Sequence, residues 1–283
     1  MASVKWQWPL DSSVAFGSNI NIDTESQSRE GGKPNPDASV HLPRILCLHG
    51  GGTNRRIFAA QCRVLRAHLA THFRLVFADA PFPSPPGPDV ESVYAGWGPF
   101  RSWLPMFYQP DADRETVERI DANIAAALRE DDAAGARGPV VALLGFSQGA
   151  KMAASLLFRR QRERELRKGT KATTDYRFAV LFAGRGPLIS LASDPDPEAN
   201  ERGIENHIVQ TKETLLLQLP TIHVHGLHDV GIEAHRELLH ISCQKGSTRL
   251  VEWDGDHRMP IKTRDVAAVV AEILQLASSL GLR

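Results

Sequence analysis

The residues with the clearest chemical potential surround Ser147, in the segment GFSQGA at positions 145–150. This G-x-S-x-G pattern follows the apolar run PVVALLGF and precedes a stretch with helical periodicity. In that setting it predicts a sharp strand-to-helix turn that lifts the serine hydroxyl clear of the sheet. Side chains at Gly145 or Gly149 would collide with adjacent strands. The bare pattern also occurs as an ordinary glycine-rich turn, but its setting favours Ser147 as a nucleophile.

A serine hydroxyl needs a base to remove its proton, and the chain offers eleven histidines. In the fold that carries such a turn, the partners follow the serine in the order acid, then histidine. The segment TRLVEWDGDHRMP places His257 just beyond a predicted strand, in a turn rich in Gly and Asp. His68 and His240 fall within predicted helices and are expected at the surface. We therefore predict that His257 is the base.

The acid is expected just past the preceding strand, where IHVHGLHDV spans residues 222–230. This segment supplies Asp229, which would fix the tautomer of the base and stabilise its imidazolium. Asp254 and Asp256 are rival candidates. They lie so close to His257 in the sequence that neither would need the end of a strand to place it, unlike the acid expected in this fold. Asp229 is the predicted acid.

The same segment raises an alternative, because His223, His225 and His228 together with Asp229 resemble a metal ligand set. Metallo-β-lactamase-type enzymes use H-x-H-x-D-H, whereas the order here is H-x-H-x-x-H-D. Strand alternation places His223 and His225 on one face, where covering helices would bury them. A metal needs further ligands, and the sequence identifies none. We expect no metal and no cofactor.

Stabilising an oxyanion requires two backbone N–H groups aimed at the developing charge. One is predicted at Gln148, the residue after the nucleophile. The other is predicted at Gly51 in LHGGGTN, with Gly52 as its rival, because glycines allow a ligand to approach the backbone closely. A plain turn is the alternative. A phosphate loop is excluded, since no Gly-Lys-Ser/Thr follows.

An aromatic stretch over residues 94–108 is a candidate wall for an apolar pocket, with Trp97 and Trp103 as the predicted substrate contacts. The alternative is that these rings only tie down a long loop. The irregular segment 185–213 is either a small lid or an insertion. The run RRQRERELRKGTK predicts a solvated helix end, or else a docking site for an acidic carrier protein through Arg159 and Arg160.

The composition of the chain limits which partners and which compartment are expected. Lys+Arg and Asp+Glu both total 33 in 283 residues, so neither nucleic acid nor an anionic membrane is expected as a partner. Three scattered cysteines suit a reducing compartment. No run of about 18 apolar residues occurs, and the start lacks a secretory signal, so a cytoplasmic location is expected.

Beyond a polar extension at residues 1–43, strands and helices alternate over residues 44–283. This alternation predicts an α/β fold with a doubly wound, mostly parallel sheet, helices on both faces and a small lid or insert. One continuous helix is expected after the first strand, beginning at Asn54, and another begins at Asp113. Chemistry in such folds lies beyond the carboxyl ends of the strands.

Several blocks in fixed order resemble the fungal "family of serine hydrolases" (FSH) group of α/β-hydrolases. They are LCLHGGGTNRRIF, FADAPFPSPPGP, GPFRSWL, GFSQGA, HGLHD and GDHRMPIKTRDV. The resemblance runs from about Arg44 to the C-terminus and implies the same nucleophile, acid and base as the residues themselves. It also implies that GPFRSWL faces the substrate.

Some members of that group are free-standing thioesterases of polyketide pathways, such as the lovastatin-pathway releasing enzyme. The resemblance therefore implies a thioesterase that releases an acyl or polyketide chain from CoA or the acyl-carrier domain of a synthase, in fungal secondary metabolism. A carboxylesterase of small oxygen esters is the first alternative. A non-catalytic ligand-binding protein on a hydrolase scaffold is the second.

Overall fold

The computed structural model describes residues 38–88, 90–105, 112–166, 175–191 and 216–282. The predicted extension 1–43 therefore lies outside the described residues as far as residue 37. Most of the predicted lid, from residue 192 onward, also lies outside them. Within the described part, no helix is long and apolar enough to cross a membrane.

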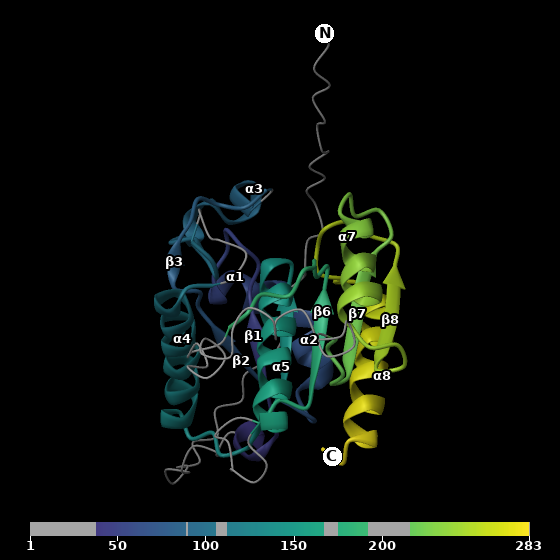
Figure 1. Cartoon of the computed structure of the whole chain (residues 1–283). Coiled ribbons are helices and arrows are strands. Elements are labelled where there is room, and N and C mark those ends of the chain that lie inside the picture. The colour runs from purple at the N-terminus through teal and green to yellow at the C-terminus, as the bar shows by residue number, and fades with distance from the viewer. Residues whose placement is uncertain (1–37, 89, 106–111, 167–174, 192–215, 283) are drawn as a thin grey trace, which may run out of the picture. The chain divides into compact units, whose positions relative to one another are not determined.

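Six parallel strands form the central sheet, in the order β2-β1-β5-β6-β7-β8 (Figure 1). Their bounds are β1 Arg44–Leu48, β2 Arg74–Ala78, β5 Val140–Phe146, β6 Phe178–Phe182, β7 Thr221–Gly226 and β8 Thr248–Trp253. After β2 the chain returns to the other side of β1, so the strand order reverses between β1 and β5. A separate antiparallel pair consists of β3 (Phe82–Pro83) and β4 (Arg101–Ser102).

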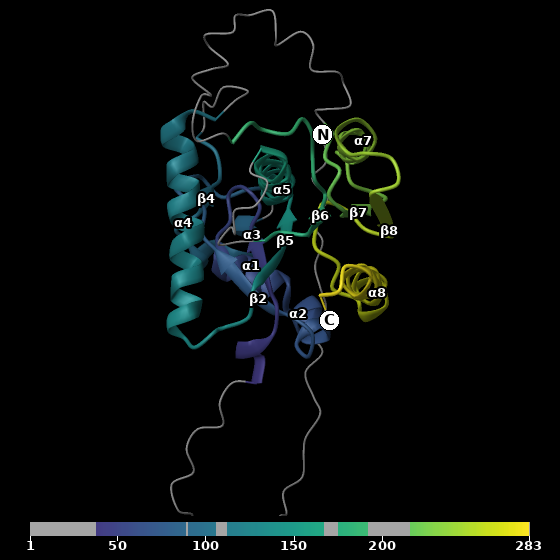
Figure 2. The ribbon, with the colours of Figure 1, turned by 60° about the horizontal axis from the view of Figure 1, so that its bottom comes forward.

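Helices cover both faces of the sheet, with α4, α5 and α7 on one side and α1, α2 and α8 on the other (Figure 2). Their bounds are α1 Arg55–Gln61, α2 Arg63–Leu69, α3 Val90–Tyr94, α4 Arg114–Ala133, α5 Gln148–Leu166, α7 Ile232–Glu237 and α8 Thr263–Ser279. Short 3₁₀ turns span Ala38–His41 and Ala95–Trp97, and a π-helical turn spans Leu238–Ser242.

Side chains of each strand alternate between two apolar cores. Along β1, Leu46 and Leu48 belong to the core beneath α4 and α5, whereas Ile45 and Cys47 belong to the core beneath α1, α2 and α8. All four are fully buried, as expected for a parallel strand covered on both faces. The predicted doubly wound fold is confirmed.

The prediction of one continuous helix after β1 is wrong, because the chain forms two helices that meet at Cys62. The predicted cap is present: the Asn54 side chain accepts from the Ile57 N–H at 2.9 Å. Buried positions continue along one side, from Ile57 to Leu65 and Leu69, so hydrophobic spacing does not reveal the break. Asp113 caps α4 in the same way through the Thr116 N–H.

The turn from β5 into α5 packs backbone against backbone. A Cβ atom on Gly149 would lie 2.0 Å from the carbonyl oxygen of Leu48 in β1. A Cβ atom on Gly145 would lie 2.2 Å from the carbonyl oxygen of Gly149, so it meets the helix start and not the neighbouring strand that we predicted. Both glycines let α5 begin in direct contact with the sheet.

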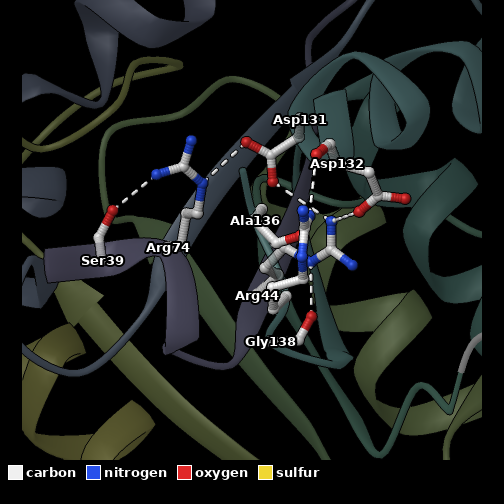
Figure 3. A network of polar contacts seen from close by, with 8 residues as sticks. Ser39, Arg44, Arg74, Asp131, Asp132, Ala136 and Gly138 are labelled. Carbon is white, nitrogen blue, oxygen red and sulfur yellow. Dashed lines mark hydrogen bonds and ion pairs between the residues drawn. The ribbon is translucent and has the colours of Figure 1, made fainter. Parts of the chain in front are cut away.

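A polar network joins the starts of β1 and β2 to the end of α4 (Figure 3). Arg44 and Arg74 are register partners on adjacent strands, so their like charges lie close together. The Asp131 carboxylate accepts from both, at 3.3 Å from Arg44 and 2.8 Å from Arg74. Asp132 and the Gly138 carbonyl accept further hydrogen bonds from Arg44. These contacts hold the amino-terminal ends of β1 and β2 against α4, at the end of the sheet opposite the carboxyl ends of the strands.

Gly149→Ala should lower the free energy of unfolding by about 2–3 kcal/mol, because a methyl group has no space beside the Leu48 carbonyl. Gly96→Ala is the matched control, since nothing lies within 4 Å of its Cβ position, and it should stay within about 0.5 kcal/mol. Urea unfolding measures both. Equal stability of the two variants would contradict the packing argument.

Asp131→Asn should lower the free energy of unfolding by about 2–3 kcal/mol, because two largely buried guanidinium groups lose their shared counter-ion. Glu118→Gln removes a carboxylate that pairs with Arg114 at an exposed site, so it should cost about 0.5 kcal/mol or less. Thermal and urea unfolding test this prediction, and a loss in Asp131→Asn no larger than in Glu118→Gln would refute it.

Candidate active site

Ser147 occupies the turn between β5 and α5 with a backbone φ of 54°, in the left-handed region that non-glycine residues rarely adopt. Its N–H donates to the Phe182 carbonyl of β6 at 2.8 Å, which holds the strained turn against the next strand. The side chain is half-buried, and α5 begins at the following residue. The hydroxyl therefore lies beside a helix N-terminus, which favours negative charge.

His257 lies between Ser147 and Asp229. Its Nε2 is 3.0 Å from the Ser147 Oγ, and its Nδ1 is 2.6 Å from the Asp229 Oδ2. The serine follows β5, the aspartate follows β7 and the histidine follows β8, so all three stand beyond the carboxyl ends of parallel strands. The structure thus brings together the three residues that the sequence proposed as nucleophile, base and acid.

Asp229 is buried with an exposed fraction of 3%. Burial acts to raise its pKa, but hydrogen bonds from the Gly231 N–H, His235 and His257 outweigh this and lower the pKa to about 2. Because the pKa is lowered in the folded state, the carboxylate stabilises the fold above about pH 4 and loses that contribution as the pH falls through about 2.

The two rival acids lie elsewhere. Asp254 contacts the exposed His228 at 2.8 Å, and Asp256 pairs with Arg258 at 3.4 Å, both at the surface. Neither carboxylate is hydrogen-bonded to His257 in the described part of the chain. Proximity in sequence therefore did not bring them to the imidazole, because the β8–α8 loop turns their side chains outward.

His235 is a site residue that the sequence prediction did not single out. It projects from α7 with no exposed surface, and its Nε2 is 2.9 Å from the same Asp229 Oδ2 that His257 contacts. Its Nδ1 is 3.0 Å from the Gly184 carbonyl oxygen. Burial lowers the pKa of His235, and Asp229 opposes that effect. Its position in the first helical turn after the acid loop was the only available signal.

The histidines that suggested a metal ligand set do not converge. His223 and His225 are buried on one face of β7, as strand alternation predicted, and His228 is exposed in the following loop. Burial lowers the pKa of His223 to about 3 and that of His225 to about 4. Among the described residues, the group with metal-ligand chemistry is instead Asp229, His235 and His257, whose ligand atoms lie within 4.8 Å of one another.

The loop after β1 lies against the start of α5. A Cβ atom on Gly51 would lie 3.2 Å from the Gln148 Oε1, so the two predicted oxyanion residues are neighbours. Neither backbone N–H donates a hydrogen bond within the described residues, and both remain available. The rival Gly52 donates to the Arg101 carbonyl at 2.9 Å, so its N–H is occupied. This contrast favours Gly51.

Trp103 is not a wall of an open pocket, and that prediction is wrong. The side chain has no exposed surface, and its indole N–H donates to the His49 carbonyl at 2.9 Å. Its backbone N–H donates to the Gln148 Oε1 at 2.8 Å. Trp103 therefore supports the glycine loop from within the core, because its indole N–H and its backbone N–H both have hydrogen-bond partners there.

Trp97, the other predicted substrate contact, is partly exposed. Its ring packs edge-on against Tyr94, and the Arg56 guanidinium lies 4.1 Å from the ring centroid. Its carbonyl accepts from the Asn54 side chain at 2.7 Å, which ties the aromatic loop to the α1 cap. Substrate contact by Trp97 stays a prediction.

Arg159 and Arg160 are engaged within the fold. Arg159 binds Asp121 of α4 through both terminal nitrogens, at 3.0 and 2.7 Å. Arg160 pairs with Glu163 and Asp175. The part of the basic run from residue 167 onward lies outside the described residues. For Arg159 and Arg160, these internal ion pairs favour the predicted solvated helix end over a docking site, because their charges are already compensated.

The arrangement has the parts needed for acyl transfer: a hydroxyl aligned with an imidazole, a buried carboxylate behind it and two adjacent backbone donors. An imidazole at 3.0 Å can accept the hydroxyl proton, and a carboxylate at 2.6 Å can stabilise the resulting cation.

Comparison with known proteins gives a match to "Serine hydrolase (FSH1)" over residues 39–269. The chain is 57% identical to a "Probable esterase" of Aspergillus terreus over 258 residues, which cover 88% of this chain and 94% of that protein. It is 52% identical to "Probable esterase afoC" of Emericella nidulans over 273 residues, which cover 85% and 92% of the two chains. It is 49% identical to "Esterase pigG" of Monascus ruber over 262 residues, which cover 87% and 95%.

These matches span nearly the whole described fold, including the strands and loops that carry Ser147, Asp229 and His257. The chain belongs to the FSH1 family of serine hydrolases, and it is an enzyme with an α/β-hydrolase fold.

Proposed function

We propose that this serine hydrolase cleaves acyl thioesters through Ser147, with His257 as base and Asp229 as the acid that orients it. The observation that carries the proposal is the hydrogen-bonded line from Ser147 through His257 to Asp229, with contacts of 3.0 and 2.6 Å. The strained backbone of Ser147 supports it, because such strain gathers at sites of chemistry.

The reaction proceeds in two halves. The Ser147 Oγ attacks the acyl carbon while its proton moves to the His257 Nε2, and the amides of Gly51 and Gln148 hold the oxyanion. The C–S bond then breaks, and the thiolate takes the proton from His257. Water attacks the acyl-enzyme, gives one proton to His257 and releases the acid, after which Ser147 recovers its proton. No metal or cofactor takes part.

The proposed substrate is an acyl or polyketide chain on CoA or on the acyl-carrier domain of a synthase, in fungal secondary metabolism. The resemblance to polyketide-releasing enzymes supports this choice. The three cysteines, Cys47, Cys62 and Cys243, are free and buried, which fits the proposed cytoplasmic location. Neither nucleic acid nor a membrane is needed as a partner.

Hydrolysis of oxygen esters is the second candidate, and the esterase names of the relatives favour it. The same tetrahedral chemistry serves both substrates, so the triad does not discriminate between them. The third reading, a ligand-binding protein without activity, conflicts with an aligned serine, histidine and aspartate.

Ser147→Ala should reduce kcat by about 10³- to 10⁴-fold or more while leaving the fold intact, and Asp229→Asn should reduce the kcat of its folded fraction by a similar factor. The serine variant lacks the nucleophile, and the asparagine variant loses the anion that orients His257. Asp254→Asn is the matched control, because this exposed carboxylate contacts His228, and its activity should stay within about twofold of wild type. Hydrolysis assays measure turnover, and fluorophosphonate labelling measures the reactivity of the Ser147 hydroxyl. Full activity in Ser147→Ala would overturn the assignment.

Acyl thioesters should be hydrolysed with a kcat/KM at least about tenfold higher than oxygen esters of the same chain length. The comparison uses N-acetylcysteamine thioesters and matched oxygen esters, with Ser147→Ala as the blank for spontaneous hydrolysis. An equal or reversed preference would replace the thioesterase proposal by the carboxylesterase one. Repeating the assay with the acyl chain on a carrier domain then reports whether the protein partner increases the rate.

A further inference from the structure

Two histidines share one oxygen of the Asp229 carboxylate. The Oδ2 atom lies 2.6 Å from the His257 Nδ1 and 2.9 Å from the His235 Nε2, while Oδ1 accepts from the Gly231 N–H at 2.8 Å. The two imidazole rings stack with centroids 5.9 Å apart and planes 24° apart. The hydrogen bonds from Ser147 through His257 to Asp229 do not involve His235. The contact of this buried histidine with the acid must therefore have another role.

The partners of His235 determine where its proton lies. Its Nε2 faces the Asp229 carboxylate, and its Nδ1 faces the Gly184 carbonyl at 3.0 Å. Both groups only accept hydrogen bonds, so a neutral ring can donate to one of them and an imidazolium can donate to both. The carboxylate is the stronger acceptor. In either protonation state, Nε2 therefore carries a proton directed at Oδ2.

A donor on Oδ2 acts on His257 through the carboxylate. It fixes the plane of the carboxylate, which aligns the catalytic ring with Ser147. Loss of this donor should therefore reduce the turnover rate and leave substrate binding almost unchanged.

The surroundings of His235 contain other titratable and charged groups. In the described part of the chain, the titratable side chains facing its ring are Asp229, His257 and His225, the last with ring centroids 5.7 Å apart. The Arg185 guanidinium lies against Gly231, within the loop that carries the acid. Apart from Asp229, each of these groups is neutral or positive, so none replaces the carboxylate as the partner of His235.

We propose that His235 is a positioning residue of the triad, whose Nε2–H fixes the orientation of the Asp229 carboxylate and, through it, that of His257. This inference rests on the proposed function of Ser147, Asp229 and His257. It assigns to α7 a part in catalysis that acts through Asp229.

The test compares two variants, each of which places an amide N–H donor at the position of one of the two ring nitrogens. In His235→Gln the side-chain amide nitrogen stands the same number of bonds from Cβ as Nε2, so it can still donate to Asp229. In His235→Asn the amide nitrogen stands where Nδ1 did, so it reaches only the Gly184 carbonyl. Both variants are polar, uncharged and smaller than histidine, and a structural loss in either one lowers the folded fraction, which the final extent of labelling reports.

The measurements are kcat and KM on an acyl thioester, and the rate of fluorophosphonate labelling, each from pH 5 to 9. His235→Asn should lower kcat by about 10- to 100-fold while KM changes by about twofold or less. His235→Gln should recover at least about a third of the wild-type kcat. The final extent of labelling gives the folded fraction and corrects each rate.

Equal values of kcat in the two variants would overturn the proposal. A second measurement on the wild-type enzyme keeps it testable if a variant folds poorly. Imidazole ¹⁵N spectra should show a protonated His235 Nε2 from pH 6 to 8, and an unprotonated Nε2 would refute the inference. Failure of the proposed function gives a different result, because wild type and Ser147→Ala would then hydrolyse substrate equally.

Discussion

The backbone contact between the start of α5 and the sheet is the constraint on which the rest of the site depends. Gly149 stands so close to the Leu48 carbonyl that any side chain there would overlap it. This closeness forces Ser147 into the left-handed region, where the Phe182 carbonyl holds its N–H. The energy stored in the turn is offset by packing on both faces of the sheet. The serine hydroxyl is consequently placed by the whole core and not by a flexible loop.

The second organising element is the negative charge of Asp229. A buried carboxylate is costly unless it is paired and hydrogen-bonded. Here a backbone N–H and two imidazoles surround it, and together they outweigh the effect of burial on its pKa. The same contacts that make the charge tolerable also point His257 at Ser147. Stability and catalytic alignment therefore have a common physical source.

The aromatic segment between β2 and α4 supports the glycine loop after β1. Trp103 bridges the His49 carbonyl and the Gln148 side chain, and the Asn54 amide binds two carbonyls of the aromatic loop, those of Trp97 and Pro99. Buried hydrogen bonds of this kind restrict the loop to one arrangement. A pre-organised loop can present the Gly51 amide to a developing charge without reorganising during the reaction. The aromatic segment thus supports the glycine loop and the start of α5 through these hydrogen bonds.

Local patterns in the sequence were sufficient to predict the order of strands and helices, the caps at Asn54 and Asp113, and the turn at Ser147. Each depends on residues within a few positions of one another. Tertiary structure decided between Asp229 and its rivals Asp254 and Asp256. It also distinguished the Gly51 amide, which donates to no group among the described residues, from that of Gly52, which donates to Arg101.

Tertiary structure alone also buried Trp103, broke the first helix at Cys62 and brought His235 to the acid. The line from Ser147 to His257 joins residues 110 positions apart, and that from His257 to Asp229 joins residues 28 apart. No local pattern encodes which way a loop side chain turns at such separations. That direction is set by the packing of the elements on either side, because a buried polar group must find its partner within the folded core.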